Sequence, residues 1–326
     1  MSAKTINEAL KMTGNYEDLN KAKGVIFGLA IGDALGARTE FMRLDQIRAK
    51  YGKDGIRDLP SPALFTDDTQ MSVAIAEALV RAGDKDIASI MEAVREEFIK
   101  WSHLPETYKK APGNTCLQGV ANMERGIRWS RSGLANSKGC GSAMRAAPIG
   151  YLYQHEPEKL KEVAHTTGIC THGHPAADAA CIGAAYLVKL ALDGVPPDKI
   201  IAQLFTFTAG VSAEFDQAIS KVEKCLGWRD EEKALSYLGE GWVGEEAVAL
   251  ALYCFMRNPD SYEKVVIRGA NTNGDSDSIA CIAGSISGAY LGIDEIPPEW
   301  VRKIEKSPYL EDLAQSLAAK KEAING

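Results

Sequence analysis

The sequence predicts an all-α protein. Apolar residues recur at helical spacing through most of the chain, and no segment shows sustained alternation of apolar and polar residues. Aromatic residues make up only 7% of the chain, although strands favour aromatic and β-branched side chains. No stretch has the composition of a linker, so we expect a single compact multi-helix domain over residues 1–326, with residues 1–21 as an N-terminal extension.

The first predicted helix, residues 22–36, has a glycine at every fourth position. These glycines lie along one side of the helix, and each costs about 1 kcal/mol relative to alanine. Close approach of a second helix is the usual reason to keep them. The spacing returns in residues 284–292, where a second helix is predicted. We expect both helices to pack closely in the centre of the fold, and packing against each other would satisfy both. The glycines are Gly24, Gly28, Gly32 and Gly36 in the first segment and Gly284, Gly288 and Gly292 in the second.

Two short acidic segments, residues 65–71 and 274–278, share one design. Each places two carboxylates and a hydroxyl directly before a predicted helix, the first ending at Gly83 and the second covering residues 279–291. The N-terminus of a helix tolerates negative charge, because its free N–H groups and dipole favour anions. Helix capping alone would explain either segment.

Both segments together favour a metal site. Four carboxylates in one partly buried place repel one another by roughly several kcal/mol unless a cation lies between them. Oxygen ligands without a nearby Cys or His pair favour Mg²⁺, Mn²⁺ or Ca²⁺ over zinc. Capping and metal binding both remain open on the spacing alone.

Residues 37–42 form a predicted loop that contains Glu40. By residue type alone, an exposed loop glutamate is the simpler interpretation. A short helix is expected at 44–51, and Pro60 and Pro62 favour an extended approach to the first acidic segment.

The middle of the chain alternates helices with glycine-containing loops. An amphipathic helix is expected at 87–101, a loop at 102–113, and a helix from Asn114 through Ile127. After a loop at 130–138, the glycine-rich turn 139–145 leads into a further helix. Such a turn can bind an anion through its backbone N–H groups, although an ordinary tight turn has the same sequence, and it lacks the spacing of a dinucleotide-binding loop.

His172 and His174 begin the following helix, residues 176–192. A third nitrogen or sulfur ligand at metal-binding spacing is absent from the neighbourhood, so we expect one histidine to cap the helix or line a pocket. The helix is apolar on nearly every side, which is typical of a buried central helix. Further helices are expected at 198–208, 212–226, 230–239, 244–257, 260–269, 279–291, 298–305 and 309–319.

Charge and cysteine usage restrict the function classes. The net charge of −7 argues against nonspecific binding of nucleic acid or anionic membranes. The seven cysteines are scattered and never spaced C-x-x-C, which is typical of small buried side chains in a reducing compartment. We see no signal peptide and no apolar run of transmembrane length, and expect a cytoplasmic protein.

Six motifs occur in one order that resembles the ADP-ribosylglycohydrolase family. They are residues 28–36 with Glu40-Phe41, residues 66–71, 113–115, 141–145, 171–175 and 274–278. The resemblance covers residues 22–294. It is closest to the arginine-directed branch, which contains the ADP-ribosylarginine hydrolases and the dinitrogenase-reductase-activating glycohydrolases, in residues 40–42 and 111–115.

The resemblance implies a dinuclear Mg²⁺ or Mn²⁺ centre in a cleft of an all-α fold. The matching metal-ligand positions are Thr66, Asp67, Asp68, Asp275, Asp277 and Ser278. Glu40 matches a loop glutamate that closes over the metals, which reverses the simpler interpretation of that residue. Two positions depart from the common pattern: Cys140 stands where Asn is frequent, and Ser278, which keeps the hydroxyl, where Thr is frequent.

The implied reaction removes ADP-ribose from a modified protein by hydrolysis at C1″. The implied catalytic residues are Glu40, Asp67, Asp68 and Asp277, with either Glu40 or a metal-bound aspartate as the general base. Candidates for binding ADP-ribose are Gly113, Asn114, Thr115, Gly139, Gly141, Ser142 and His172.

Arginine is the expected acceptor, through an N-glycosidic bond. Glu106, the only carboxylate of the loop 102–110, is a candidate to receive a guanidinium leaving group, with a solvated loop glutamate as the alternative. Other readings are a serine-type or nucleobase-linked ADP-ribose hydrolase, or a non-catalytic ADP-ribose-binding module. A metal-dependent phosphohydrolase or an all-α isoprenoid synthase could also place aspartates on facing helices, but the synthase is disfavoured because Thr69, Gln70 and Met71 follow Asp68 without the D-D-x-x-D spacing.

Overall fold

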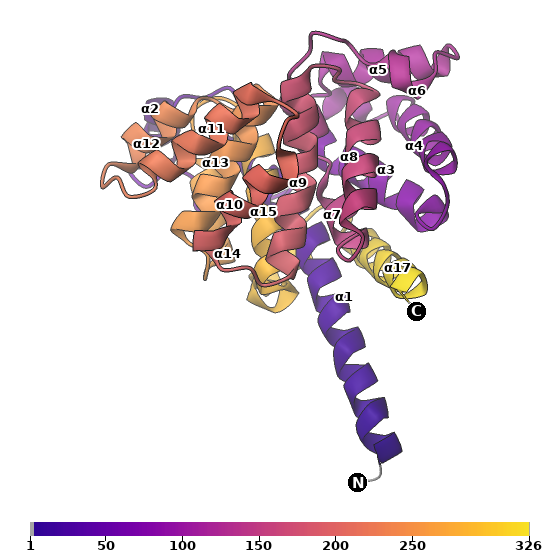
Figure 1. Cartoon of the computed structure of the whole chain (residues 1–326). Coiled ribbons are helices and arrows are strands. Elements are labelled where there is room, and N and C mark those ends of the chain that lie inside the picture. Colours follow the sequence, from indigo (N-terminus) through magenta and orange to yellow (C-terminus); the bar gives the residue numbers. More distant parts are fainter. Residues whose placement is uncertain (1–2, 326) are drawn as a thin grey trace.

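The computed structural model describes residues 3–325 and consists of helices joined by loops (Figure 1). The helices are α1 (Ala3–Gly36), α2 (Leu44–Tyr51), α3 (Asp67–Ala82), α4 (Ile87–Ser102), η1 (Thr107–Lys109), α5 (Asn114–Glu124), α6 (Trp129–Ser132), η2 (Cys140–Ser142), α7 (Ala147–Leu152), α8 (Pro157–Ile169), α9 (Pro175–Leu192), α10 (Pro197–Thr208), α11 (Ala213–Cys225), α12 (Glu231–Leu238), α13 (Gly244–Arg257), α14 (Tyr262–Ala270), α15 (Ser276–Leu291), η3 (Ile293–Glu295), α16 (Pro298–Lys303) and α17 (Ser307–Asn325). Over these residues, bridge pairing of β type is confined to three isolated pairs. The all-α prediction is confirmed.

Helices α1 and α15 pack against each other along their glycines. They run antiparallel, because Gly24 of α1 faces Gly288 of α15, whereas Gly28, four residues further along α1, faces Gly284. A Cβ atom added at Gly28 would lie 2.4 Å from the carbonyl oxygen of Gly284, and one at Gly288 would lie 1.9 Å from that of Gly24. Any side chain there would overlap the facing backbone, so the glycine spacing did predict a close helix pair, and the two helices are each other's partner.

This pairing determines where the two helix ends meet. A Cβ at Gly36, the last residue of α1, would lie 2.6 Å from the Cα of Asp277 in the first turn of α15. The loop that follows α1 therefore begins directly over the second acidic segment. The pairing is thus the structural reason that Glu40 lies close to Asp275 and Asp277.

Helix α9 lies in the core, as its apolar sequence predicts. It packs against α7, α8, α13 and α15, and residues such as Cys181 and Leu187 are fully buried. By length and composition alone, Pro175–Leu192 is apolar enough to cross a membrane, which corrects the expectation that no run reaches that length. Because 72% of that stretch is buried inside the fold, its apolar character is accounted for by the core.

The largest departures from the predicted helices are at α1, α5 and α8. Helix α1 already begins at Ala3, so the segment expected to precede the first helix is, from Ala3 on, part of it, and its first part extends away from the body (Figure 1). Helix α5 ends at Glu124, because Gly126 adopts a positive φ of 86°. Helix α8, for which no helix was predicted, begins with Pro157, a residue preorganised for the first turn.

Candidate metal centre and active site

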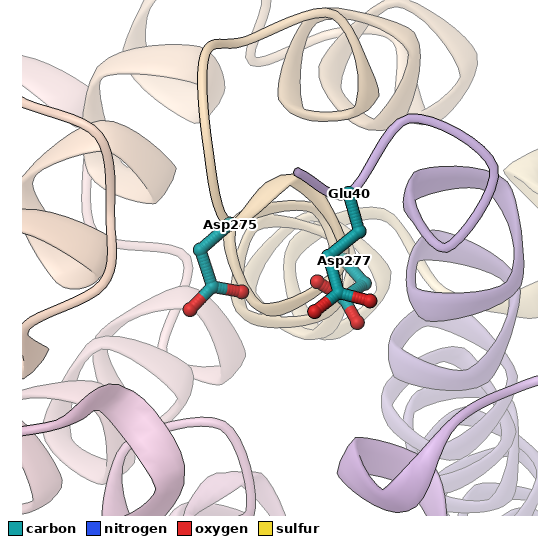
Figure 2. A group of neighbouring side chains, drawn as sticks. All are labelled: Glu40, Asp275 and Asp277. Carbon is teal, nitrogen blue, oxygen red and sulfur yellow. The ribbon is translucent and has the colours of Figure 1, made fainter. Parts of the chain in front are cut away.

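Acidic side chains from three parts of the chain meet where α1 ends and α3 and α15 begin. Oxygen atoms of Glu40, Asp275 and Asp277 lie within 4.8 Å of one another (Figure 2). Asp67 and Asp68 are the first two residues of α3. Burial is the main reason that the pKa values of Asp67 and Asp68 are raised, and the nearby charges of Glu40 on Asp67 and of Asp275 on Asp68 raise them further. The fold therefore brings both predicted acidic segments and Glu40 together.

Asp33 holds the start of α3 in place, a role that the sequence analysis missed. The side chain is fully buried, and its oxygens accept hydrogen bonds from the backbone N–H of Thr66 at 3.0 Å and of Thr69 at 3.0 Å. Burial raises the pKa of Asp33 to about 6, although the bonds from Thr69 and Thr66 oppose that rise. One signal was present: Asp33 is an acidic residue inside a helix whose surroundings are otherwise apolar and glycine-rich.

Among the candidate ligand carboxylates, some buried oxygens have no hydrogen-bond partner in the described part of the chain. Burial is the main reason that the pKa values of Asp68 and Asp277 lie well above the ordinary value, and neighbouring carboxylates raise them further. Burial and the nearby Asp275 raise the pKa of Glu40 to about 7. Over the described residues, Asp68 Oδ2 and Asp277 Oδ1 are buried oxygens without a hydrogen-bond partner. Such oxygens are costly unless a cation neutralises them, so the residues fit a hard divalent ion.

The hydroxyl and thiol groups complete the same region. Thr66 is the N-cap of α3, and its hydroxyl accepts a hydrogen bond from the N–H of Asp68 at 3.2 Å. Ser278 lies in the first turn of α15, with its Oγ 3.5 Å from the thiol of Cys140. That thiol also donates to Asp275 Oδ2 at 2.8 Å. Cys140, which stands where the family often has Asn, thus contacts a candidate ligand directly.

The two glycine-containing loops predicted to bind ADP-ribose are joined to each other and to the acidic group. The N–H of Gly113 donates to Asp67 Oδ2 at 3.3 Å. Thr115, in the first turn of α5, shares a hydrogen bond of 2.9 Å with Ser137 in the approach to the second loop. Asn114 is exposed. The loops therefore lie beside the acidic group.

The second loop packs on His172. A Cβ at Gly141 would lie 2.9 Å from His172 Cε1, and one at Gly139 would lie 3.3 Å from its Nε2. This packing alone requires glycine at 141. Ser142 is fully buried and donates its hydroxyl to the carbonyl of Ala177 at 3.1 Å. The part of this loop that can meet a ligand is therefore its backbone.

The two histidines have different places. His174 caps α9, with its Nδ1 accepting from the N–H of Ala176 at 3.1 Å. His172 is buried beneath the loop, and burial together with the guanidinium of Arg145 lowers its pKa to about 3, so its ring is neutral. Arg145 is itself buried and donates to Thr171 Oγ1 at 2.6 Å. His172 thus supports the loop backbone from below.

Glu106 has a partner on the other side of α3. Its carboxylate lies 3.2 Å from Lys306 Nζ. Both residues line a cavity of about 370 Å³ that also includes Phe65, Trp101 and Leu104. The carboxylate of Glu106, predicted to receive a guanidinium, thus forms an ion pair with Lys306.

Comparison with known proteins agrees with this geometry. The ADP-ribosylglycohydrolase family model matches residues 14–325. An ADP-ribosyl-[dinitrogen reductase] glycohydrolase of Rhodospirillum rubrum is 29% identical, over 88% of this chain and 90% of its own. An ADP-ribosylarginine hydrolase Tri1 of Serratia proteamaculans is 26% identical, over 92% and 80% of the two chains. The ADP-ribosylhydrolase ARH3 of Homo sapiens is 25% identical, over 93% and 94%.

A solved structure supports the same assignment at the level of the whole chain. A protein described as an ADP-ribosylglycohydrolase-related protein complex superposes with a TM-score of 0.75 at 25% identity, covering 94% of this chain and 99% of that one. The match of the family model extends over all five candidate carboxylates. Fold, acidic group and sequence agree, and the chain belongs to the ADP-ribosylglycohydrolase family.

Proposed function

We propose that this hydrolase removes ADP-ribose from arginine side chains of modified proteins, at the N-glycosidic bond, with two Mg²⁺ or Mn²⁺ ions. The observation that carries the metal is the buried pair of unpartnered oxygens, Asp68 Oδ2 and Asp277 Oδ1. The names of the Rhodospirillum rubrum and Serratia proteamaculans relatives support the arginine linkage.

Six residues would hold the ions: Thr66, Asp67, Asp68, Asp275, Asp277 and Ser278. Their donor atoms are all oxygen, which suits Mg²⁺ and Mn²⁺. When bound, such ions supply charge that orients ribose hydroxyls and acidifies a water molecule. Cys140 keeps its proton for the hydrogen bond to Asp275 Oδ2, and would orient that carboxylate.

Glu40 is our choice for the general base. It lies on the loop after α1, it is only partly buried, and its oxygens lie beside those of Asp275 and Asp277, where it can take a proton from a water molecule held there. The oxygen of water forms a bond to C1″ while one proton passes to Glu40. The bond from C1″ to the arginine nitrogen breaks, its electron pair stays on that nitrogen, and a proton returns to it as guanidinium leaves.

The glycine loops would bind the diphosphate of ADP-ribose. Gly113, Asn114 and Thr115 begin α5, where free N–H groups favour an anion. Gly139 and Gly141 carry no side chain that could cover the loop backbone, and the neutral ring of His172 supports them from below. Asp67, held by the N–H of Gly113, connects this subsite to the acidic group.

The test is release of free ADP-ribose from defined substrates. We expect turnover of ADP-ribosyl-arginine peptide with Mg²⁺ or Mn²⁺, and its loss in EDTA. A matched ADP-ribosyl-serine peptide should react more slowly. Efficient cleavage of the serine peptide with the arginine peptide left intact would overturn the linkage, and full activity after EDTA treatment would overturn the metal.

A further inference from the structure

An exposed aromatic pair lies next to Glu40. The rings of Phe41 and Trp242 stack with their centroids 5.1 Å apart at an interplanar angle of 25°. Phe41 is 71% exposed and Trp242 is 37% exposed. Phe41 also has a positive φ of 63°, which is strained for a bulky residue. Such a ring in water, held in a strained backbone, points to a role in binding.

Hydrogen bonds fix this pair against the start of α15. The N–H of Phe41 donates to the carbonyl of Gly274 at 2.9 Å, and the N–H of Gly274 donates to that of Met42 at 3.2 Å. A Cβ at Gly274 would lie 2.9 Å from Trp242 Nε1. Only glycine at 274 lets the indole approach so closely.

A carboxylate completes the arrangement. Glu240 Oε2 accepts a hydrogen bond from Trp242 Nε1 at 3.3 Å. The other oxygen of Glu240 lies 3.6 Å from a guanidinium nitrogen of Arg43. The chain thus already places one of its own guanidinium groups at this carboxylate, beside the aromatic rings. Glu240 is half exposed and Arg43 more so, so water or a ligand can replace the arginine.

The arrangement adjoins the acidic group at two points. Phe41 follows Glu40 directly, and the carbonyl of Glu240 accepts from the N–H of Asp275 at 2.9 Å. Phe41, Trp242 and Glu240 therefore lie directly beside Glu40 and the second acidic segment.

We propose that Phe41, Trp242 and Glu240 form the subsite for the guanidinium of the arginine leaving group. The inference rests on the arginine linkage proposed above. A planar guanidinium stacks on aromatic faces and pairs with a carboxylate, and it does both better than an ammonium. Glu240 takes the place predicted for Glu106, because its backbone carbonyl accepts a hydrogen bond from the N–H of Asp275 and so ties it to the acidic group.

Arg43 then competes with the substrate for Glu240. Replacing it by Gln keeps the backbone N–H that donates to Gln46 at 2.8 Å, so α2 should still form. Arg43→Gln should lower KM for an arginine-linked substrate. A merely structural ion pair would not give that result.

The experiment compares two variants of the subsite with two matched controls. Glu240→Gln and Trp242→Leu change the subsite. Glu232→Gln removes another exposed glutamate paired with an arginine, Arg48 at 2.5 Å, and Tyr237→Leu removes another aromatic side chain, 38% exposed. For each we would measure KM and kcat on ADP-ribosyl-arginine peptide, and Kd for free ADP-ribose by calorimetry.

Glu240→Gln should raise KM by about tenfold, the size of one charge-assisted hydrogen bond, and leave Kd for ADP-ribose unchanged. Trp242→Leu should act in the same direction, and both controls should match wild type. Unchanged KM in both subsite variants, or a rise in Kd for ADP-ribose equal to the rise in KM, would overturn the subsite while leaving the proposed function standing. Wild-type enzyme without activity on the arginine peptide would overturn both.

Discussion

Asp33 and Thr69 are joined by two hydrogen bonds, since one carboxylate oxygen accepts from both the backbone N–H of Thr69, at 3.0 Å, and its hydroxyl, at 2.5 Å. The bonds cross from α1 to α3. They hold the first turn of α3, and with it Asp67 and Asp68, at a fixed place relative to the glycine-packed helix pair. The position of one half of the acidic group thus depends on a residue that is not itself a candidate ligand.

Asp33→Ala should destabilise the protein and weaken metal binding. It leaves the N–H groups of Thr66 and Thr69 buried without acceptors, at a cost of about 2–4 kcal/mol. Thr69→Val, which removes only the hydroxyl donor, should cost less. Denaturant unfolding and Mn²⁺ titration would measure both effects, and equal stability of Asp33→Ala and wild type would contradict this role.

Asp68→Asn and Asp277→Asn should each abolish turnover and yet raise the melting temperature of the metal-free protein. Both carboxylates are buried among like charges, and amides of the same shape remove that repulsion. The gain in melting temperature that Mg²⁺ gives wild type should be lost. Circular dichroism melts with and without EDTA test this, and a lower metal-free melting temperature in both variants would argue against repulsion.

Gly28→Ala and Gly288→Ala should each destabilise the protein by about 1–3 kcal/mol or more, because the added methyl group overlaps facing backbone. Leucine at either position should cost more. Gly227→Ala is the matched control, because a Cβ there meets no heavy atom within 4 Å. Thermal melts give the comparison. If Gly28→Ala or Gly288→Ala had the same melting temperature as Gly227→Ala, the two helices could move apart at that position without loss of stability.

The metal-free protein should become less stable as pH rises. The pKa of Glu40 is raised from 4.5 to about 7 in the folded state, so the folded protein retains a proton that the unfolded chain has lost. The stability from that proton is fully present below pH 4.5 and is lost as pH rises through about 7. Asp33, with its pKa raised to about 6, adds in the same direction.

Bound Mg²⁺ should reverse that trend, since the cation competes with protons for the same oxygens. Melting temperatures between about pH 5 and pH 8, with EDTA and with Mg²⁺, provide the measurement. Glu40→Gln should flatten the EDTA curve. A metal-free protein that gains stability across this range would show that the carboxylates are ionised in the folded state.

The sequence predicts this fold well because its strongest signals are periodic. Gly24 to Gly36 and Gly284 to Gly292 predict a close helix pair, and apolar spacing gives most helix bounds within a few residues. The acidic segments and Glu40 are brought together as expected. Asp33 was missed because a single aspartate in a helix has no pattern around it. The pairing of Glu106 with Lys306 was missed because Lys306, just before α17, lies 200 residues further along the chain.

The glycine contacts between α1 and α15 also limit how the protein can change. Because carbonyl oxygens fit against glycines at four-residue intervals, the helices cannot slide by a fraction of a turn, and the next register lies about 6 Å away, four residues at 1.5 Å each. The register of the two helices therefore fixes the distance between Glu40 and Asp277. New substrates must be accommodated by side-chain exchanges in the loops around the helix pair, such as residues 239–243. An engineer who wants a different leaving group should diversify those loops and leave the two helices alone.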